Sequence, residues 1–247
     1  MKHLKKLILI VLAMSILFAM SACARRDDGK LIMATNAAFP PYEYYENGVI
    51  VGIDAEIAQA IADKLGLELV IEDMEFGSII TAVQSRKVDM GMAGMTITKE
   101  RLVSVNFSTP YTTASQVIIV KENSNITGPD DLADKSVGVQ ESTTGDIYIT
   151  DEYPDADVQR YSKGVEAVQA LIQGKVVAVV IDSEPAKVFV KQNSGLKILP
   201  EAYTIEDYAI AVSKKNKDLL EKINTALAEL TADGTIKSII DKYISAD

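Results

Sequence analysis

The stretch Met90-Gly-Met-Ala-Gly-Met-Thr-Ile-Thr-Lys-Glu-Arg101 indicates how this chain is built. It starts within an apolar run, residues 88–92, which is too short for a helix and is typical of a buried strand. Gly94 then frees the backbone, and Thr98 is a suitable N-cap for a short helix that includes Arg101. Such a turn brings N–H groups, hydroxyls and a guanidinium together. The stretch therefore predicts an anion site, with a surface position for Arg101 as the alternative.

Strand-like and helix-like segments alternate before this stretch. Strands are expected at residues 31–35 and 67–71, and helices at residues 54–65 and 78–85. Asp54 is the N-cap candidate of the first helix. This alternation predicts a mainly parallel sheet with helices on both faces.

The connections between these segments carry the turn signals. Asn47-Gly48 predicts a type I′ hairpin, and Gly66 is expected to end the first helix. Ligands of such sheets bind beyond the carboxyl ends of the strands. We therefore expect the loops at Asn36, Phe76 and Gly94 to converge.

The second half of the chain repeats this construction. A strand at residues 137–139, a helix at 165–173 and a strand at 176–181 follow the same order as before. Gln140-Glu-Ser-Thr-Thr-Gly145 follows its strand as the Gly94 loop follows its own. Two similar lobes are the simplest account, with these two loops facing each other across a cleft. A strand at 208–212 and helices at 218–231 and 235–243 then follow, and they are expected to be scaffold.

Composition excludes several classes of function. The 247 residues fit two domains, and nearly half of them are hydrophobic. Only three of the 25 Lys and Arg, and none of the 35 Asp and Glu, precede Cys23, so the remainder has a formal charge of −13. Nucleic acid and anionic lipid surfaces are poor partners for such a chain. The one histidine is His3, which excludes Ser-His or Cys-His catalysis and histidine-type zinc sites in the folded part.

The amino terminus has the pattern of an export signal. Residues 1–6 are basic, and residues 7–20 are an apolar run suited to a signal-peptide core but short for a membrane span. Met20-Ser-Ala-Cys23 resembles the lipobox of bacterial lipoproteins, in which the cysteine becomes lipidated. Ordinary secretion with a leftover cysteine is the alternative. No internal disulfide can form, because Cys23 is the only cysteine.

Four segments carry a family resemblance that spans nearly everything after the leader. They are residues 52–62 (GIDAEIAQAIA), 93–101 (AGMTITKER), 137–144 (VGVQESTT) and 181–185 (IDSEP). They resemble the polar amino-acid-binding proteins of ABC importers, which have the type II periplasmic-binding fold. The resemblance implies a signal peptide at 1–22, a lipidated tether at 23–30, a first lobe at 31–110 and 209–247, hinge strands at 111–115 and 204–208, and a second lobe at 116–203.

The same resemblance implies a binding site between the lobes. Arg101 would hold the α-carboxylate of the ligand, and Asp182, which could instead cap a helix, would hold the α-ammonium. Phe39 and Phe76 would stack on the ligand side chain. The other expected ligand-binding residues are Asn36, Ala93, Gly94, Thr96, Gln140, Thr143 and Thr144. No metal or cofactor is expected.

The identity of the ligand depends on a few positions. Asn36 stands where glutamine and basic-residue binders of the family commonly have Asp, and Gln140 could bond a neutral side chain. A neutral polar amino acid, with glutamine first, is therefore favoured. If Glu141 points inward, a basic ligand becomes the better expectation.

Two other functions share this scaffold. A periplasmic cyclohexadienyl dehydratase would need a carboxylic acid with a raised pKa deep in the cleft, and neither Glu141 nor Glu184 has an obvious partner. A receptor that reports to a membrane kinase would have the same fold. The favoured function is a substrate-binding lipoprotein that is not an enzyme. It would be anchored through lipid, such as palmitate, on Cys23 to the outer face of the bacterial cytoplasmic membrane, or be periplasmic, and would serve a permease and an ATPase.

Overall fold

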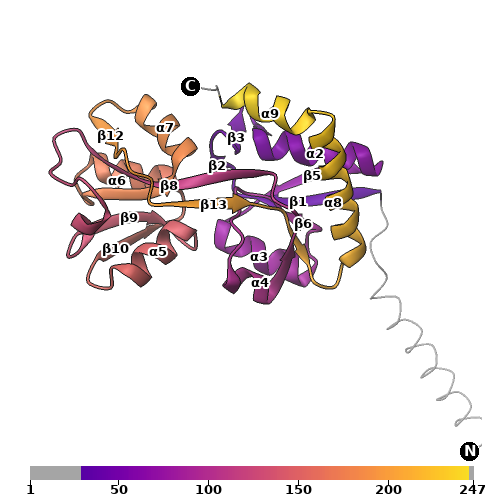
Figure 1. Cartoon of the computed structure of the whole chain (residues 1–247), viewed down its shortest axis with the longest axis horizontal. Helices are drawn as coiled ribbons and strands as arrows, with labels where there is room; N and C mark the ends of the chain where they lie inside the picture. The colour runs from indigo at the N-terminus through magenta and orange to yellow at the C-terminus, as the bar shows by residue number, and fades with distance from the viewer. Residues whose placement is uncertain (1–28, 245–247) are drawn as a thin grey trace, which may run out of the picture. The chain divides into compact units, whose positions relative to one another are not determined.

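The computed structural model describes residues 29–244, so the predicted signal peptide, Cys23 and most of the tether lie outside the described residues. Two α/β lobes make up the rest (Figure 1). The predicted fold class is confirmed, although the main sheet of each lobe is mixed rather than mainly parallel. The residue boundaries of the lobes and of the hinge stay predictions.

The first lobe contains a five-stranded sheet with the order β5-β1-β6-β14-β7. Its strands are β1 (Lys30–Thr35), β5 (Glu68–Asp73), β6 (Met90–Gly91), β7 (Val105–Phe107) and β14 (Ala211–Ser213). Its helices are α2 (Ile53–Leu65), α3 (Phe76–Ser85), α4 (Lys99–Ser104), α8 (Lys217–Ala232) and α9 (Thr235–Tyr243). A small sheet is formed by β2 (Ala38–Phe39), β3 (Glu43–Glu46) and β4 (Val49–Val51).

The second lobe contains a sheet with the order β10-β9-β11-β8-β12, and β13 also pairs with β8. Its strands are β8 (Thr112–Lys121), β9 (Ser136–Gln140), β10 (Asp157–Tyr161), β11 (Ala178–Asp182), β12 (Leu196–Ile198) and β13 (Thr204–Tyr208). Its α-helices are α5 (Thr144–Glu152), α6 (Gly164–Ile172) and α7 (Ser183–Gln192), and a short 3-10 helix spans Pro129–Leu132.

Strands β8 and β13 run antiparallel to each other, from Thr112 opposite Tyr208 to Gln116 opposite Thr204 (Figure 1). These are the segments in which the hinge is predicted. The structure corrects one expectation here: residues 208–212 are not one strand. Tyr208 ends β13, and β14 starts at Ala211, where it enters the first sheet between β6 and β7.

Local sequence signals explain several element ends. Gly66 adopts the left-handed conformation and ends α2, as predicted. The backbones of Asn47 and Gly48 both have positive φ, 52° and 81°, as a type I′ hairpin between β3 and β4 requires. The Thr98 side chain accepts a hydrogen bond from the Arg101 N–H at 3.2 Å, so Thr98 caps α4 as predicted.

The expected role of Asp54 as the cap of α2 is wrong. The helix begins one residue earlier, at Ile53, with Gly52 as the N-cap residue. Asp54 is fully buried and accepts hydrogen bonds from the Tyr111 hydroxyl and from the Gly94 N–H. A carboxylate with these two partners supports the binding loop of the first lobe rather than a helix end.

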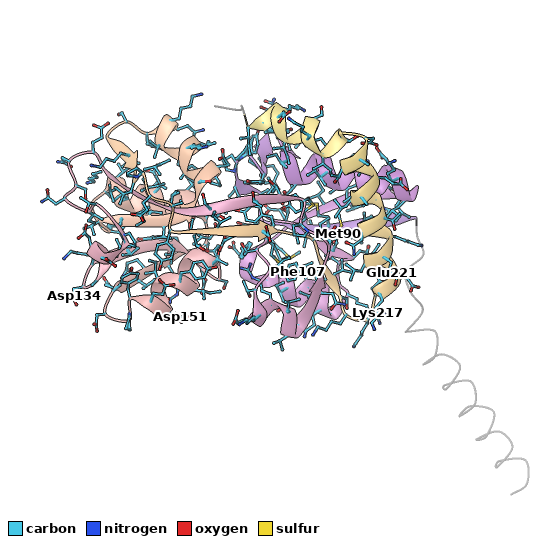
Figure 2. All side chains as sticks on the ribbon, in the orientation of Figure 1. Met90, Phe107, Asp134, Asp151, Lys217 and Glu221 are labelled. Atoms are coloured by element: carbon cyan, nitrogen blue, oxygen red, sulfur yellow. The ribbon has the colours of Figure 1, made fainter. Side chains whose placement is uncertain are left out.

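Apolar side chains fill both faces of the first sheet. Met33 and Met90 pack with Ile57 of α2 and Ile223 of α8 in one core, and α3 covers the opposite face. Figure 2 shows Lys217 and Glu221 on the outer side of α8, away from the sheet. Within residues 29–244, no helix has both the length and the apolar character needed to cross a membrane.

Candidate functional site

One cavity brings together all eleven residues predicted to bind the ligand. Elements of both lobes line it, and one acid that the sequence did not single out, Glu43, lines it as well. The predicted convergence of the loops at Asn36, Phe76 and Gly94 is therefore confirmed, while their contacts with a ligand stay predictions. The lining residues are Asn36, Phe39, Glu43, Phe76, Ala93, Gly94, Thr96, Arg101, Gln140, Thr143, Thr144 and Asp182.

Arg101 is the cationic group of the cavity. Its side chain is 8% exposed, and its guanidinium donates to the Thr96 carbonyl at 2.7 Å and to the Ser142 carbonyl at 3.1 Å. The guanidinium carbon lies 5.2 Å from the centre of the Phe76 ring, within cation–π range. Burial lowers the pKa of Arg101, whereas the charges of Glu206 and Asp182 oppose that shift. An arginine keeps its charge under such conditions, so the site holds a fixed, oriented cation.

Gly94 allows the first-lobe loop to pass close to aromatic rings. Its φ is 53°, and a Cβ placed there would lie 2.9 Å from Phe39 and 3.1 Å from Tyr208. The Gly94 N–H donates to Asp54 at 2.8 Å, which fixes the loop from behind. Burial raises the pKa of Asp54 to about 6, although hydrogen bonds from Gly94 and Tyr111 oppose the shift. Any larger residue at position 94 would displace the rings.

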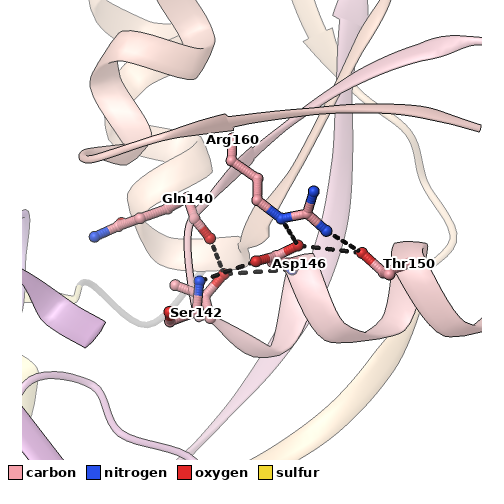
Figure 3. A network of polar contacts seen from close by, with 6 residues as sticks. Gln140, Ser142, Asp146, Thr150 and Arg160 are labelled. Carbon is pink, nitrogen blue, oxygen red and sulfur yellow. Dashed lines mark hydrogen bonds and ion pairs between the residues drawn. The ribbon is translucent and has the colours of Figure 1, made fainter. Parts of the chain in front are cut away.

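The second-lobe loop is held by its own polar contacts (Figure 3). Thr143 caps α5, and the Asp146 side chain accepts a hydrogen bond from the Ser142 N–H at 3.0 Å. Asp146 also forms an ion pair with Arg160 at 2.9 Å. The Arg160 guanidinium in turn donates to the Thr150 hydroxyl at 2.7 Å. This network fixes the start of α5, where Thr144 faces the cavity.

Asp182 is the carboxylate at the end of β11. It is 6% exposed, and the Tyr208 hydroxyl donates a hydrogen bond to it. Asp182 stands at the N-cap position of α7, as the alternative predicted, but its side chain makes no capping hydrogen bond there. Burial raises the pKa of Asp182 to about 7, and the charge of Glu206 adds to that shift. A bound cation would favour the ionised form.

The two lobes contact each other across the cavity. The Gln140 amide donates to the Asn36 side-chain oxygen at 3.0 Å, and Arg101 reaches the Ser142 carbonyl. The contact is also close at Gly77, where a Cβ would lie 2.9 Å from the Ser142 hydroxyl oxygen. Asn36, Arg101 and Gln140, which line the cavity, thus take part in direct contacts between the lobes.

Sequence reasoning missed two buried acids. Glu43 in β3 lines the cavity at 1% exposure, and its Oε2 has no hydrogen-bond partner within the described residues. Burial, and then the charge of Asp54, raises the pKa of Glu43 well above its usual value. Glu206 in β13 lies behind the threonines of the site. Glu141, which the sequence left open, is exposed and does not line the cavity.

Comparison with known proteins identifies the family. The model of the bacterial extracellular solute-binding proteins, family 3, matches residues 31–246 of this chain. The chain belongs to this family. It is a solute-binding protein and not an enzyme, because its similar relatives are amino-acid-binding proteins.

Relatives in this family match along the whole chain. The arginine-binding extracellular protein ArtP of Bacillus subtilis is 34% identical, over 99% of this chain and 100% of its own length. The ABC transporter arginine-binding protein 1 of Escherichia coli is 35% identical, over 97% of this chain and 99% of its own length. An ancestral arginine-binding protein has been solved with arginine and with glutamine. In both forms it is 44% identical to this chain, covers 88% of it and 99% of its own chain, and has a TM-score of 0.84.

Proposed function

We propose that this family member is the substrate-binding subunit of an ABC amino-acid importer and that it captures an L-amino acid between its lobes. Arg101 would pair with the α-carboxylate and Asp182 with the α-ammonium. Two opposite clamps a few ångströms apart select a zwitterion, and a site closed from water strengthens both. The similarity, over nearly the whole chain, to an arginine-binding extracellular protein and to an ABC transporter arginine-binding protein supports this role.

The proposal for the side chain of the ligand rests on Glu43. Once Arg101 and Asp182 are paired with the backbone groups of the ligand, Glu43 is the lining acid left without a counter-charge. A cationic side chain would supply that charge, because a buried carboxylate is stable only when paired or protonated. We therefore place arginine ahead of glutamine, contrary to the expectation drawn from Asn36.

Glutamine remains the second candidate for a specific reason. The amides of Asn36 and Gln140 lie at the cavity and bond each other, so they could instead bond the amide of a ligand. The ancestral relative was solved with either amino acid. The two candidates make different demands on Glu43. Only arginine needs its negative charge, because the side chain of glutamine is neutral.

Titration calorimetry with arginine, citrulline and glutamine separates these candidates. Citrulline has nearly the shape of arginine without its charge. We expect the wild type to bind arginine at least tenfold more tightly than citrulline, and Glu43→Gln to lose most of this ratio. Glu46→Gln is the matched control, because Glu46 is an exposed acid on the same strand. If glutamine binds more tightly than arginine, or if Glu43→Gln leaves the ratio unchanged, the arginine assignment is wrong.

The anchor and the transport partners are part of the same proposal. We expect Cys23 to be lipidated, so labelled palmitate should enter the wild type and be absent from Cys23→Ser. A permease and an ATPase are expected to complete the importer. Uptake of labelled arginine in vesicles carrying those subunits should depend on the added binding protein. Ligand binding without any stimulated uptake would favour the receptor role.

A further inference from the structure

Glu206 is a buried acid whose carboxylate joins three other segments of the chain. It lies in β13 and is 4% exposed. Its Oε2 accepts hydrogen bonds from the Thr96 hydroxyl at 2.9 Å, the Gln116 amide at 3.1 Å and the Thr144 hydroxyl at 3.0 Å. Its Oε1 has no hydrogen-bond partner in the part of the chain that the structure describes.

The three donors come from different parts of the fold. Thr96 follows β6 in the first lobe, Thr144 is the first residue of α5 in the second lobe, and Gln116 lies in β8. Glu206 itself lies opposite Ala114 in the antiparallel pair of β8 and β13. One oxygen atom of Glu206 therefore joins the Thr96 loop of the first lobe to the Thr144 turn of the second lobe, next to the paired strands β8 and β13.

This arrangement changes what the two threonines can do. A hydroxyl has a single hydrogen to donate, and in this structure both hydroxyls donate to Glu206. They are therefore not donors to the α-carboxylate of a ligand while these bonds persist. The bonds are charge-assisted when Glu206 is ionised, and such bonds are about twice as strong as neutral ones.

We propose that Glu206 is a positioning residue for closure: its carboxylate binds Thr96 and Thr144 at once and so holds the lobes together, with or without a ligand. When the lobes part, the two hydroxyls cannot both stay within hydrogen-bond distance of the same oxygen. Opening then leaves a buried carboxylate with fewer donors, which is unfavourable. The inference rests on the two-lobe closure of the proposed function but not on the identity of the ligand.

Single-molecule energy transfer in the absence of ligand tests this directly. Dyes would be placed at exposed positions of the two lobes, on Gln84→Cys in α3 and Asp155→Cys before β10, in a soluble form that starts at Arg25. Glu206→Leu removes the acceptor, and Glu206→Gln keeps the shape without the charge. Asp207→Asn is the matched control, because Asp207 is an exposed acid on the same strand.

We expect the open population, relative to the closed one, to rise about tenfold in Glu206→Leu, less in Glu206→Gln, and not in Asp207→Asn. Thr144→Val should also favour opening and should add little when combined with Glu206→Leu, because both remove the same bond. Thr144→Val and Glu206→Gln keep the test valid if the leucine variant does not fold. Opening no greater than in Asp207→Asn, or fully additive effects, would overturn the proposal. Arginine titration of the same variants reports on the proposed function separately.

Discussion

The two loops that face each other across the cavity share one local design but carry opposite charges. In each, a threonine caps a helix by accepting from the N–H three residues later, Thr98 from Arg101 and Thr143 from Asp146. Arg101 extends into the cavity. Asp146 turns back to the Ser142 N–H and pairs with Arg160 within its own lobe.

This difference shows how one motif serves two purposes. An acid in the first turn of a helix satisfies free N–H groups, so the α5 loop is stabilised by its own carboxylate. A cation in the first turn gains little from the helix and can be directed toward an anion elsewhere. We infer that the first-lobe loop provides the cation for the α-carboxylate, and that the second-lobe loop at the start of α5 provides a stiff surface that closes on it.

The largest expected effect is that of removing the guanidinium. Arg101→Ala should weaken amino-acid binding by about a hundredfold to a thousandfold, because it leaves a buried carboxylate without its partner. Arg101→Lys should lose nearly as much, since an ammonium cannot form the two parallel bonds. Calorimetry measures both variants. Affinity within a few-fold of the wild type in Arg101→Lys would show that the ligand carboxylate is not held by the guanidinium fork.

The second effect is a pH dependence of ligand affinity, which we expect to come from Asp182 and not from Arg101. With the pKa of Asp182 at about 7, ligand affinity should fall about tenfold for each pH unit below 7, because the protonated acid no longer pairs with an ammonium. Arg101 does not titrate in this range. Binding measured from pH 5 to pH 8 checks this. A flat profile would contradict a role for Asp182 as the ammonium partner.

The raised pKa of Asp182 has the opposite effect on the stability of the ligand-free protein, which should decrease as pH rises. The pKa of Asp182 is raised by folding, so its contribution to stability is present below the unfolded pKa and is lost as pH rises through about 7. Thermal unfolding of Asp182→Asn without ligand should therefore show a weaker loss of stability between pH 5 and pH 8 than the wild type.

The third effect concerns the second-lobe network. Asp146→Asn should weaken binding only a few-fold and lower stability by about 1 kcal/mol, because it removes a partly exposed ion pair and weakens the bond to Ser142. Arg160→Ala is the companion variant, and the pair should be non-additive. If Asp146→Asn costs as much affinity as Arg101→Ala, the proposed division of labour between the loops is wrong.

The smallest expected effect comes from the caps. Thr98→Ala and Thr143→Ala should each cost about 1 kcal/mol of stability, a change of about 2–4 °C in melting temperature. We expect Thr98→Ala to lose more affinity, because α4 is short and carries Arg101. Differential scanning calorimetry and ligand titration together would detect this. Equal losses of affinity would mean that the cap of α4 does not position the guanidinium.

The sequence predicted local features best. Thr98, Gly66 and the Asn47-Gly48 turn act through their own backbone neighbourhood, so their roles follow from residue type and spacing. The convergence of the binding loops followed from the order of strands and helices, which places strand ends together.

The buried acids could not be predicted in this way. Glu43 and Glu206 lie in short strands with mixed polar and apolar neighbours, and no local pattern shows which face of such a strand is buried. Asp54 has the residue type and position of a cap, because it follows Gly52 near a helix start. Its partners, Gly94 and Tyr111, are distant in sequence, and only the tertiary fold brings them to it.

The position of β14 has a consequence for the order in which the molecule can be assembled during synthesis. Residues 211–213 lie between β6 and β7, whose own residues are made more than a hundred positions earlier. All five strands in the main order of the second sheet lie between residues 112 and 198, so they are available sooner. A nascent chain ending before Ala211 therefore has one sheet that can pair and another that lacks an inner strand. The lobe that supplies Arg101 is thus the last to be completed.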